Sequence, residues 1–274
     1  MERLAVLMAC YNRAETTLRS LERLYAAADG VADIDVFLVD DASPDGTKDK
    51  VKARFPSANV ILGKGSLYWA KGMRLAWESA VKNGERCDYF LWLNDDVILK
   101  RDSMAGLLAD AERCGDARGV IVGVCSEDES EVRSSYSATS ERDVQYFPNG
   151  ETPQKATGWF NGNVVLVPWA TYETVGMISG DYSHARADYD YAERLNKAGI
   201  PFFASSRFVG ICHNDYAEKM AGKGLGERIV MLLRPGYWNL ADLFRYRYRH
   251  YGLCRAVVSV CHLAFQVIFR PPHM

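Results

Sequence analysis

Short apolar runs alternate with segments of helical period over the first 125 residues. Leu4–Ala9 is the first such run, and the leucines of residues 18–24 follow it at helical spacing. Further strands are expected at Ile34–Val39, Asn59–Leu62, Tyr89–Leu93 and Val120–Val124, with helices at Lys48–Phe55, Tyr68–Lys82 and Arg101–Cys114. Continuously apolar strands that alternate with helices are typical of βαβ units. The pattern therefore predicts an α/β domain with a parallel sheet covered on both faces.

The pattern changes after residue 125. Residues 126–160 are charged and then rich in Ser and Thr, which predicts loops or a small antiparallel excursion. An apolar strand at Val164–Val167, a helix at Asp188–Ala198 and strands near Phe202–Ala204 and Phe208–Cys212 come next, and the chain is helical from Gly226 onward. We therefore divide the chain into an α/β domain, residues 1–225, and a basic, aromatic helical extension, residues 226–274.

Composition and charge narrow the class of protein. The chain has 274 residues, of which 48% are hydrophobic and 25% are charged, the usage of an ordinary globular protein. Lys and Arg total 33 against 35 Asp and Glu, and this near-neutral balance argues against a surface built for nucleic acid. Residues 228–274, however, hold seven Arg and a single acid, Asp242. The extension is therefore expected to meet something anionic.

Cysteine usage and the termini indicate a compartment. The seven cysteines are scattered without a CxxC pair, so no zinc or thioredoxin-like site is indicated, and most read as small core residues in a reducing environment. The N-terminus enters a strand at once, and the longest near-apolar stretch, Ala256–Phe269, is shorter than the roughly 18–20 residues that span a bilayer. We expect a cytoplasmic protein.

Polar residues follow three of the predicted strands. They are Cys10-Tyr11-Asn12-Arg13, Asp40-Asp41 and Asn94-Asp95-Asp96. Ligands of parallel sheets bind beyond the carboxyl ends of the strands, so these groups are expected at one crevice. Asp40-Asp41 reads equally well as a turn or helix cap. Asp95-Asp96 favours a divalent cation bound to a diphosphate, because the cation offsets the repulsion between adjacent carboxylates. No complete GxGxxG, Walker A, HExxH or GxSxG motif occurs.

Five ordered motifs carry a family resemblance. YNR, VDDASPDGT, LWLNDD, GWFNGNVVLVP and ADYDYAERL resemble the motif set of family 2 inverting glycosyltransferases, which have the GT-A fold. The segment GSLYWAKGMRLAW is similar to a helix of a bacterial rhamnosyltransferase-like branch of that family. The resemblance runs from Leu4 to about His213 and implies a mostly parallel nucleotide-binding sheet flanked by helices.

The resemblance also implies roles. Asp41 would accept a hydrogen bond from the nucleobase, Asp95 would face the ribose or the metal, and Asp96 would bind Mg²⁺ or Mn²⁺. Asp188 would be the general base, with Asp190 as the competing candidate, because the expected Glu-Asp pair reads Ala187-Asp188 here. The donor pocket is assigned to Tyr11, Asn12, Arg13, Asp41, Trp69 and Asp95, the acceptor or sugar pocket to Trp159, Asn161 and Asn163, and the metal to Asp96 and His213.

Some of these residues have a second interpretation from the sequence. His213 ends an apolar strand and reads as a buried structural histidine as readily as a metal ligand. Trp69 and Trp159 lie beside glycines and are suited to stacking on sugars, whereas Trp77 and Trp92 follow apolar periodicity and are expected in the core.

The implied function is metal-dependent, inverting transfer of a hexosyl or deoxyhexosyl group. The donor would be a nucleotide-diphosphate sugar and the acceptor a glycan or lipid-linked molecule, in cell-surface polysaccharide synthesis. One base on the acceptor and one cation on the departing diphosphate satisfy that chemistry. The alternatives are a sugar-nucleotide pyrophosphorylase, whose N-terminal glycine-rich phosphate loop is missing here, and a catalytically silent carbohydrate-binding protein of the same fold.

Residues 237–270 are candidates for an anionic membrane surface. Arg245, Arg247 and Arg249 alternate with tyrosines, and an apolar helix with one polar stripe follows. The stripe consists of Arg255, Ser259, His262, Gln266 and Arg270. Peripheral attachment to the cytoplasmic face of a membrane would suit a lipid-linked acceptor. The alternative is that the apolar positions pack on the domain or form a homodimer; nucleic acid is ranked lower because no binding module accompanies the segment.

Overall fold

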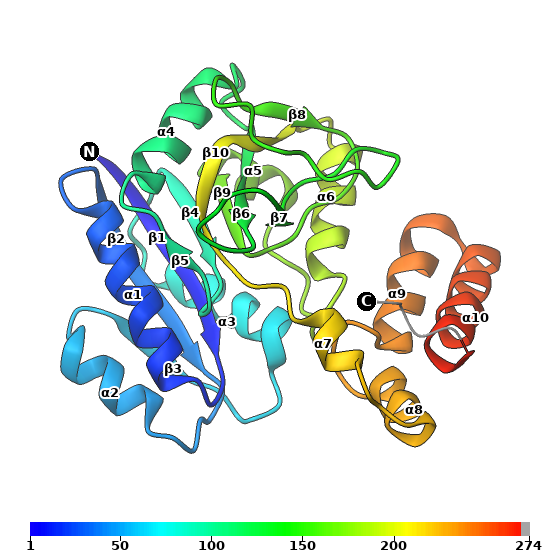
Figure 1. The fold of residues 1–274 in the computed structure, drawn as a ribbon. Coiled ribbons are helices and arrows are strands. Elements are labelled where there is room, and N and C mark those ends of the chain that lie inside the picture. Colours follow the sequence, from blue (N-terminus) through cyan, green and yellow to red (C-terminus); the bar gives the residue numbers. More distant parts are fainter. Residues whose placement is uncertain (270–274) are drawn as a thin grey trace.

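A mixed β-sheet with helices on both faces forms the centre of the molecule (Figure 1). The computed structural model describes residues 1–269, apart from the side chains of residues 216 and 217. Within that part of the chain the strands are β1 (Glu2–Cys10), β2 (Ala32–Asp40), β3 (Asn59–Leu62), β4 (Tyr89–Leu93), β5 (Ile98–Leu99), β6 (Val120–Ser126), β7 (Ser134–Tyr136), β8 (Gln154–Ala156), β9 (Val164–Pro168) and β10 (Phe202–Ile211). The helices are α1 (Ala14–Ala28), α2 (Thr47–Arg54), α3 (Tyr68–Lys82), α4 (Ser103–Arg113), α5 (Trp169–Val175), α6 (Ala187–Lys197), α7 (Tyr216–Met220), α8 (Leu225–Leu233), α9 (Leu240–Tyr251) and α10 (Leu253–Phe269).

The strand order along the sheet is β3, β2, β1, β4, β9, β6, β10, β5. Strands β3, β2, β1 and β4 run parallel to one another, and β6 runs parallel to β10. The short strands β7 and β8 pair antiparallel with β6 and β10. The fold is therefore the predicted α/β class, with a mostly parallel central sheet flanked by helices.

Strand β9 runs opposite to its neighbours, a reversal that the apolar pattern does not predict. It lies antiparallel between β4 and β6, with Leu166 opposite both Leu91 and Ile121. An apolar run buried on both faces looks the same in either direction, so the sequence pattern does not encode this reversal. Because β9 is reversed, the segment before it meets the carboxyl end of β4, where Asn94 donates its backbone N–H to the carbonyl of Asn163 (2.9 Å).

The two faces of the sheet bury separate hydrophobic cores. Successive side chains of a strand point to opposite faces, and in β1 Leu4, Val6 and Met8 pack toward α1, α2 and α4. Ala5 and Leu7 point the other way, toward α3, α5 and α6. The continuously apolar sequence of β1 is thus the consequence of burial on both sides.

Other expectations from the sequence are confirmed, with small changes. Trp77 and Trp92 are fully buried in the core beside α3 and α6. The antiparallel excursion within residues 126–160 exists as β7 and β8. The two strands expected near residues 202–204 and 208–212 form the single strand β10, whose register against β6 shifts between Ala204 and Phe208.

The cysteines are only partly where the sequence places them. Cys10, Cys87, Cys125 and Cys212 are buried in the cores, as expected of small apolar residues. Cys254 and Cys261, by contrast, are exposed on α10.

The C-terminal helices form a small unit of their own beside α6 (Figure 1). Met220, Leu232, Trp238 and Val267 make its core. Tyr246 of α9 belongs instead to the main core, and it donates a hydrogen bond to Glu193 of α6 (3.3 Å). Helix α9 therefore joins the extension to the α/β domain. Among the described residues, we find no helix with the length and apolar character that crossing a membrane requires.

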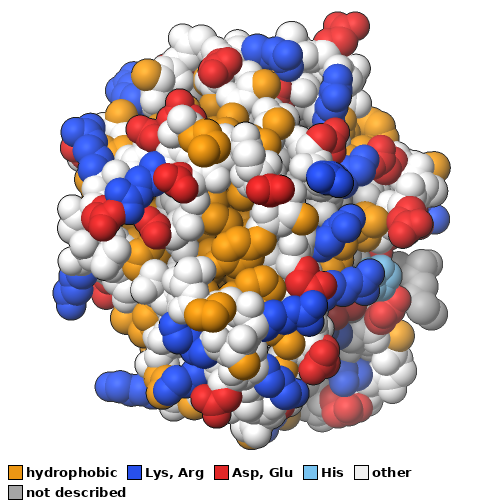
Figure 2. All heavy atoms as spheres, turned by 90° about the vertical axis from the view of Figure 1, so that its left-hand side faces the viewer, with side chains coloured by type: hydrophobic (Ala, Val, Ile, Leu, Met, Phe, Trp, Pro, Cys, Tyr) orange, Lys and Arg blue, Asp and Glu red, His pale blue; other side chains and the backbone are white. Residues whose placement is uncertain are grey.

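Charges are distributed differently on the two sides of the molecule. Figure 2 shows the left-hand side of Figure 1, where basic and acidic side chains are interspersed. The excess of arginine noted in the sequence lies in the C-terminal helices at the other side (Figure 1). The extension is therefore the part of the chain where the sequence concentrates basic side chains.

Candidate active site

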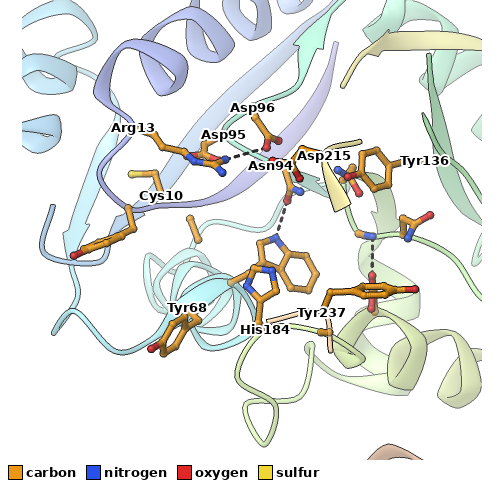
Figure 3. Close-up of a pocket in the computed structure, with 18 of the residues that line it drawn as sticks. Cys10, Arg13, Tyr68, Asn94, Asp95, Asp96, Tyr136, His184, Asp215 and Tyr237 are labelled. Atoms are coloured by element: carbon orange, nitrogen blue, oxygen red, sulfur yellow. Dashed lines mark hydrogen bonds and ion pairs between the residues drawn. The ribbon is translucent and has the colours of Figure 1, made fainter. Parts of the chain in front are cut away.

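A cavity of about 370 Å³ opens at the carboxyl ends of β1 and β4. It gathers side chains from α6, from the segment before β9 and from the C-terminal extension (Figure 3). The predicted site residues that line it are Tyr11, Arg13, Asp41, Trp69, Asp95, Asp96, Asn161, Asn163, Asp188 and His213. Asn12, Trp159 and Asp190 are predicted site residues that do not line it.

Asp95 and Asp96 meet a single arginine at one end of the cavity. Nη1 of Arg13 lies 3.0 Å from Oδ2 of Asp96 and 3.5 Å from Oδ1 of Asp95 (Figure 3). Burial and the neighbouring Asp96 carboxylate raise the pKa of Asp95 to about 7, although Arg13 opposes the shift. The pair is therefore a site where an added cation lowers the electrostatic cost of two adjacent carboxylates.

The donor set at this end fits a divalent metal bound together with substrate. Mg²⁺ commonly takes one or two protein carboxylates and completes its shell with water and substrate phosphates. Asp95 and Asp96 supply such carboxylates, and Asp215 lines the same cavity. In the described part of the chain, three or more His, Cys, Asp or Glu side chains do not come together as a complete metal shell. A metal here would therefore depend on the diphosphate of a ligand for its remaining bonds.

His213 lies at the rim rather than in the core. Its side chain is 57% exposed, so it is not the buried structural histidine that the sequence also allowed. Nδ1 contacts Glu127, and Nε2 lies 3.1 Å from Glu218. The hydrogen bond with Glu218 and the charges of both glutamates raise the pKa of His213. A metal-binding His213 would have to release these carboxylates.

The carboxylate of Asp41 holds the loop that precedes α3. Oδ1 accepts hydrogen bonds from the backbone N–H of Lys64 (3.1 Å) and Gly65 (2.7 Å). Oδ2 accepts from the N–H of Leu67 (2.7 Å) and Tyr68 (3.1 Å). These four bonds occupy most of the acceptor capacity of a carboxylate. A hydrogen bond from Asp41 to a nucleobase would therefore require this loop to rearrange.

Neighbouring polar residues have turn and capping roles. Asp40 accepts from the N–H of Ser43 (2.9 Å) and of Lys48 (3.0 Å) at the start of α2, which is the turn reading that the sequence left open for this pair. Asn12 has a left-handed backbone (φ 53°), and its N–H donates to Oγ of Ser43 (2.9 Å). Asn12 thus shapes the turn after β1 while its side chain stays outside the cavity.

Trp69, Gly162 and Asp188 form a close-packed wall of the cavity. Nε1 of Trp69 donates to Oδ1 of Asn94 (2.7 Å), which fixes the indole. A Cβ at Gly162 would stand 2.5 Å from the indole ring, so the backbone and the ring approach each other only because this residue is glycine. The N–H of Gly162 donates to Oδ2 of Asp188 (3.1 Å). The GWFNGN motif therefore positions both an aromatic face and a carboxylate.

Asp188 has the properties of a general base. Burial raises its pKa to about 6, although hydrogen bonds from the N–H of Tyr189 and Gly162 and the charge of Arg186 oppose the shift. A carboxylate with this pKa is ionised at neutral pH and is a better proton acceptor than an ordinary aspartate.

Asp190 faces away from the cavity, toward two arginines and a histidine. It is fully buried, and it contacts Arg194 (3.0 Å), Arg249 (3.2 Å) and His250 (2.9 Å). Burial alone would raise the pKa of Asp190, but these partners and the Tyr182 hydroxyl hold it at about 2. This environment makes Asp190 a weak base. Its contacts with Arg249 and His250 also hold α9 against α6.

The remaining acceptor-pocket candidates have protein partners. Trp159 stacks on Tyr189 with ring centroids 4.1 Å apart, and its Nε1 donates to Asp143 (2.7 Å). Asn161 accepts from the N–H of Ser137 (3.4 Å). Trp159 therefore supports a residue that lines the cavity instead of lining it itself.

Several lining residues were not identified from the sequence. They are Tyr68, Tyr136, His184, Arg186, Tyr189, Asp215, Lys219 and Tyr237. Arg186 directly precedes the Ala187-Asp188 pair, so its position next to the motif is a signal that could have identified it. Tyr237 lies in the extension, far along the chain, and no local pattern connects it with the site.

Comparison with known proteins agrees with the motifs. The sequence model described as Glycosyl transferase family 2 matches residues 5–165. A search of curated proteins finds no significant match.

Solved structures share the fold at low identity. S. aureus TarS 1-349 in complex with UDP-GlcNAc is 12% identical, with a TM-score of 0.57 over 98% of this chain and 82% of that one. The mannosyltransferase PcManGT from Pyrobaculum calidifontis, in complex with GDP-Man and Mn²⁺, is 17% identical, with a TM-score of 0.54 over 96% of this chain and 74% of that one. A longer TarS chain has a TM-score of 0.56 and 12% identity, and this chain, covered over 92%, spans 44% of its length.

Proposed function

Because the chain belongs to glycosyltransferase family 2, we propose that it transfers a hexosyl or deoxyhexosyl group from a nucleotide-diphosphate sugar to a glycan or lipid-linked acceptor, with inversion. The observation that carries the proposal is one cavity lined both by the acidic pair Asp95-Asp96 and by the buried carboxylate Asp188. The pair suits the diphosphate side of the reaction and Asp188 suits the acceptor side.

Asp188 acts on the acceptor hydroxyl in this mechanism. It takes the proton as the hydroxyl oxygen attacks the anomeric carbon, and the bond from that carbon to the diphosphate breaks on the opposite face, which inverts the configuration. Gly162 and Tyr189 hold the carboxylate through their N–H groups, so it does not need to reorient during the transfer. We assign the base to Asp188 because Asp190 is bound to Arg249 and His250 outside the cavity.

Asp96, with Asp95, would hold Mg²⁺ or Mn²⁺. The metal would neutralise charge on the departing diphosphate. Arg13 contacts both carboxylates and keeps them in place near the turn after β1. Trp69 offers an indole face to the sugar, since its Nε1 is already bound to Asn94.

The donor sugar is best sought with a small panel. The α3 segment GSLYWAKGMRLAW favours a rhamnosyltransferase-like branch, and with it deoxyhexosyl donors and cell-surface polysaccharide synthesis. The structural neighbours were solved with UDP-GlcNAc and with GDP-Man, so UDP-, GDP- and dTDP-sugars form the panel. Thermal shift with Mn²⁺ present ranks the donors by how much each raises the melting temperature.

Donor hydrolysis and transfer, with and without Mn²⁺, test the reaction class. Release of the nucleoside diphosphate that depends on Mn²⁺ supports a glycosyltransferase. Formation of a nucleotide sugar from a sugar phosphate and a nucleoside triphosphate would instead support the pyrophosphorylase. Sugar binding without release of nucleotide would support a silent carbohydrate-binding protein.

We also propose that the extension attaches the protein to an anionic membrane surface on the cytoplasmic side. Helix α10 buries Ala256 and Val267, while a second apolar strip of the helix faces solvent. Its exposed members are Leu253, Val257, Val258, Phe265 and Phe269. An apolar strip on a segment rich in arginine is typical of helices that lie in the headgroup region. A homodimer through the same strip is the alternative outcome.

The structure modifies which arginines could serve such a surface. Arg249 points toward α6, where it binds Asp181 and Asp190, so it does not straddle the headgroup boundary as the sequence predicted. Arg255, the first member of the polar stripe, is exposed at the start of α10. Arg270, the last member of that stripe, lies outside the described residues.

A further inference from the structure

A second cavity adjoins the first on the side of α8. Its volume is about 690 Å³, and it shares Tyr68, His184, Lys219 and Tyr237 with the first cavity. Helix α8 and the segment after it supply apolar walls, among them Val230, Met231, Pro235 and Trp238. The charged lining is biased toward cations, because Lys219, Lys223 and Arg234 face a single acid, Glu227. A ligand that enters here reaches the first cavity past Tyr237.

Arg186 contacts Tyr237, one of the residues that line both cavities. It lines the first cavity, and its guanidinium lies between the rings of Tyr189 and Tyr237, 4.8 and 5.2 Å from their centroids. Stacking on both faces leaves the edge of the guanidinium, which carries its N–H donors, to meet other groups. Nε of Arg186 is buried and has no hydrogen-bond partner among the described residues.

This arrangement is costly without a ligand. The backbone of Arg186 is left-handed (φ 74°), a conformation that is strained for a residue other than glycine. A buried donor without an acceptor adds a further penalty, which is larger for a charged group. Asp188 does not relieve it by a direct bond, because its carboxylate accepts from the N–H groups of Gly162 and Tyr189. A stacked guanidinium with a buried Nε–H that has no acceptor fits an anionic partner.

The position of Arg186 distinguishes between the two substrates. Figure 3 shows Asp95 and Asp96 at one end of the cavity and Tyr237 toward the other. The donor diphosphate belongs with Asp95 and Asp96 in the proposed function, whereas Arg186 stacks on Tyr237 and lies two residues before Asp188. We propose that the second cavity binds the acceptor, and that Arg186 binds an anionic group of that acceptor, a phosphate or a carboxylate, near the hydroxyl that Asp188 deprotonates. This inference rests on the glycosyltransferase function proposed above.

Side-chain NMR of the full chain tests the inference without turnover. The Nε–H signal of Arg186, assigned by its loss in Arg186→Lys, is followed with and without saturating UDP and Mg²⁺, a diamagnetic ion that does not broaden the signal. Glucose 1-phosphate and glucuronate are the probes, and glucose is the neutral control. We expect a saturable shift with at least one of the two anions, with UDP bound, and none with glucose. The responding anion tells whether the acceptor group is a phosphate or a carboxylate.

The contrary outcomes are distinct. A signal that moves with UDP alone would place Arg186 at the donor diphosphate and overturn the inference. The inference would also be overturned if the signal responds to neither anion, if the response does not saturate, or if glucose produces an equal response. Failure of UDP, GDP and dTDP alike to bind would contradict the proposed function itself, which separates the two failures; if only GDP or dTDP binds, that nucleotide replaces UDP in the experiment.

Calorimetry with a matched pair of variants provides a second readout. Arg186→Gln should weaken binding of the responding anion about tenfold or more, the effect of losing a charge-assisted hydrogen bond. Arg19→Gln, an exposed arginine on α1, should leave that affinity unchanged. Equal affinities in the two variants would contradict the assignment, and the NMR signal of the unaltered chain carries the test if Arg186→Gln does not fold.

Discussion

Asp188 and Asp190 lie two residues apart on the first turn of α6, yet their carboxylates occupy opposite environments. Asp188 faces the cavity and accepts the N–H of Gly162. Asp190 is fully buried on the other side, against Arg249 and His250 of α9. Burial raises the pKa of Asp188 to about 6. At Asp190 the hydrogen bond with His250 and the charge of Arg194 outweigh the effect of burial and hold the pKa at about 2. One helical turn thus carries a carboxylate suited to accept a proton, Asp188, and a carboxylate with a structural role, Asp190.

Substitution of these two residues should separate chemistry from stability. Asp188→Asn removes the base at constant size, so transfer should fall about 10²–10⁴-fold while affinity for the donor persists. Asp190→Asn removes a buried charge that binds the partly exposed Arg194 and Arg249, and it should lower the free energy of unfolding by about 1.5–3 kcal/mol. Single-turnover rates, calorimetry with UDP and denaturant unfolding measure the three quantities. If Asp190→Asn loses transfer at unchanged stability while Asp188→Asn stays active, the general base is Asp190 and not Asp188.

The pKa of Asp188 predicts a pH dependence for transfer. The carboxylate must be ionised to accept a proton, and the raised pKa means that the protonated form dominates below about pH 6. We therefore expect kcat/KM to rise about tenfold per pH unit below that value and to level off above it. The residual rate of Asp188→Asn should lack this limb. A wild-type profile that is flat from pH 5 to 8 would argue against Asp188 as the base.

The sequence pattern predicted most of the fold but only part of the site. Apolar runs locate the strands because burial on both faces is a local requirement. The direction of β9 is set by which neighbours it meets, and its apolar sequence does not record that. The fourfold hydrogen bonding of Asp41 by the loop before α3 is likewise hidden, since backbone N–H groups leave no trace in residue type.

Long-range partners explain the remaining differences. The motif contains both Asp188 and Asp190 and does not show which of them is the base. Arg249 and His250, some sixty residues later in the chain, bind Asp190 and leave Asp188 as the candidate. Tyr237 enters the cavity in the same way. Residues of the extension therefore complete a site that the motifs place wholly within the first 225 residues.

Asp96 should be required for metal-dependent binding of nucleotide. Asp96→Asn removes one negative charge beside Asp95 and Arg13, so affinity for UDP in the presence of Mn²⁺ should fall while affinity without metal changes little. The melting temperature should stay within a few degrees, because the Asp96 side chain is 37% exposed. Calorimetry with Mn²⁺ and with EDTA measures the difference, and Asp33→Asn, an exposed residue of β2, is the control. Undiminished Mn²⁺-dependent binding in Asp96→Asn would remove it from the metal site.

Gly162 should tolerate no side chain. A Cβ there would stand 2.5 Å from the Trp69 ring and 3.5 Å from Cβ of Asp188, so Gly162→Ala must displace the indole or the loop that holds the base. We expect transfer to fall at least tenfold, with a shift in Trp fluorescence. Gly106→Ala is the matched control, since its added methyl group meets nothing within 4 Å and should stabilise α4 by about 0.5–1 kcal/mol. Full activity of Gly162→Ala would show that this close packing is not needed for transfer.

The exposed strip of α10 provides the test of membrane attachment. Truncation after Leu243 would also remove Arg249 and His250, which hold Asp190, so loss of binding in that variant would be ambiguous. The full chain with Val258→Ser and Phe265→Ser changes only side chains that are 67% and 48% exposed. The two substitutions remove apolar surface from the strip while leaving the contacts of α9 with α6 intact.

We expect the unaltered chain to float with vesicles that contain anionic lipid and to bind neutral vesicles less. Each basic residue near an anionic surface contributes on the order of 1 kcal/mol, and this part weakens with salt, whereas the apolar part does not. The Val258→Ser, Phe265→Ser variant should lose the salt-insensitive part. Val144→Ser with Phe147→Ser, on an exposed loop, should bind like the unaltered chain. A chain that ignores anionic vesicles at low salt and elutes as a dimer, which the α10 variant converts to a monomer, would instead make the strip an interface between two copies.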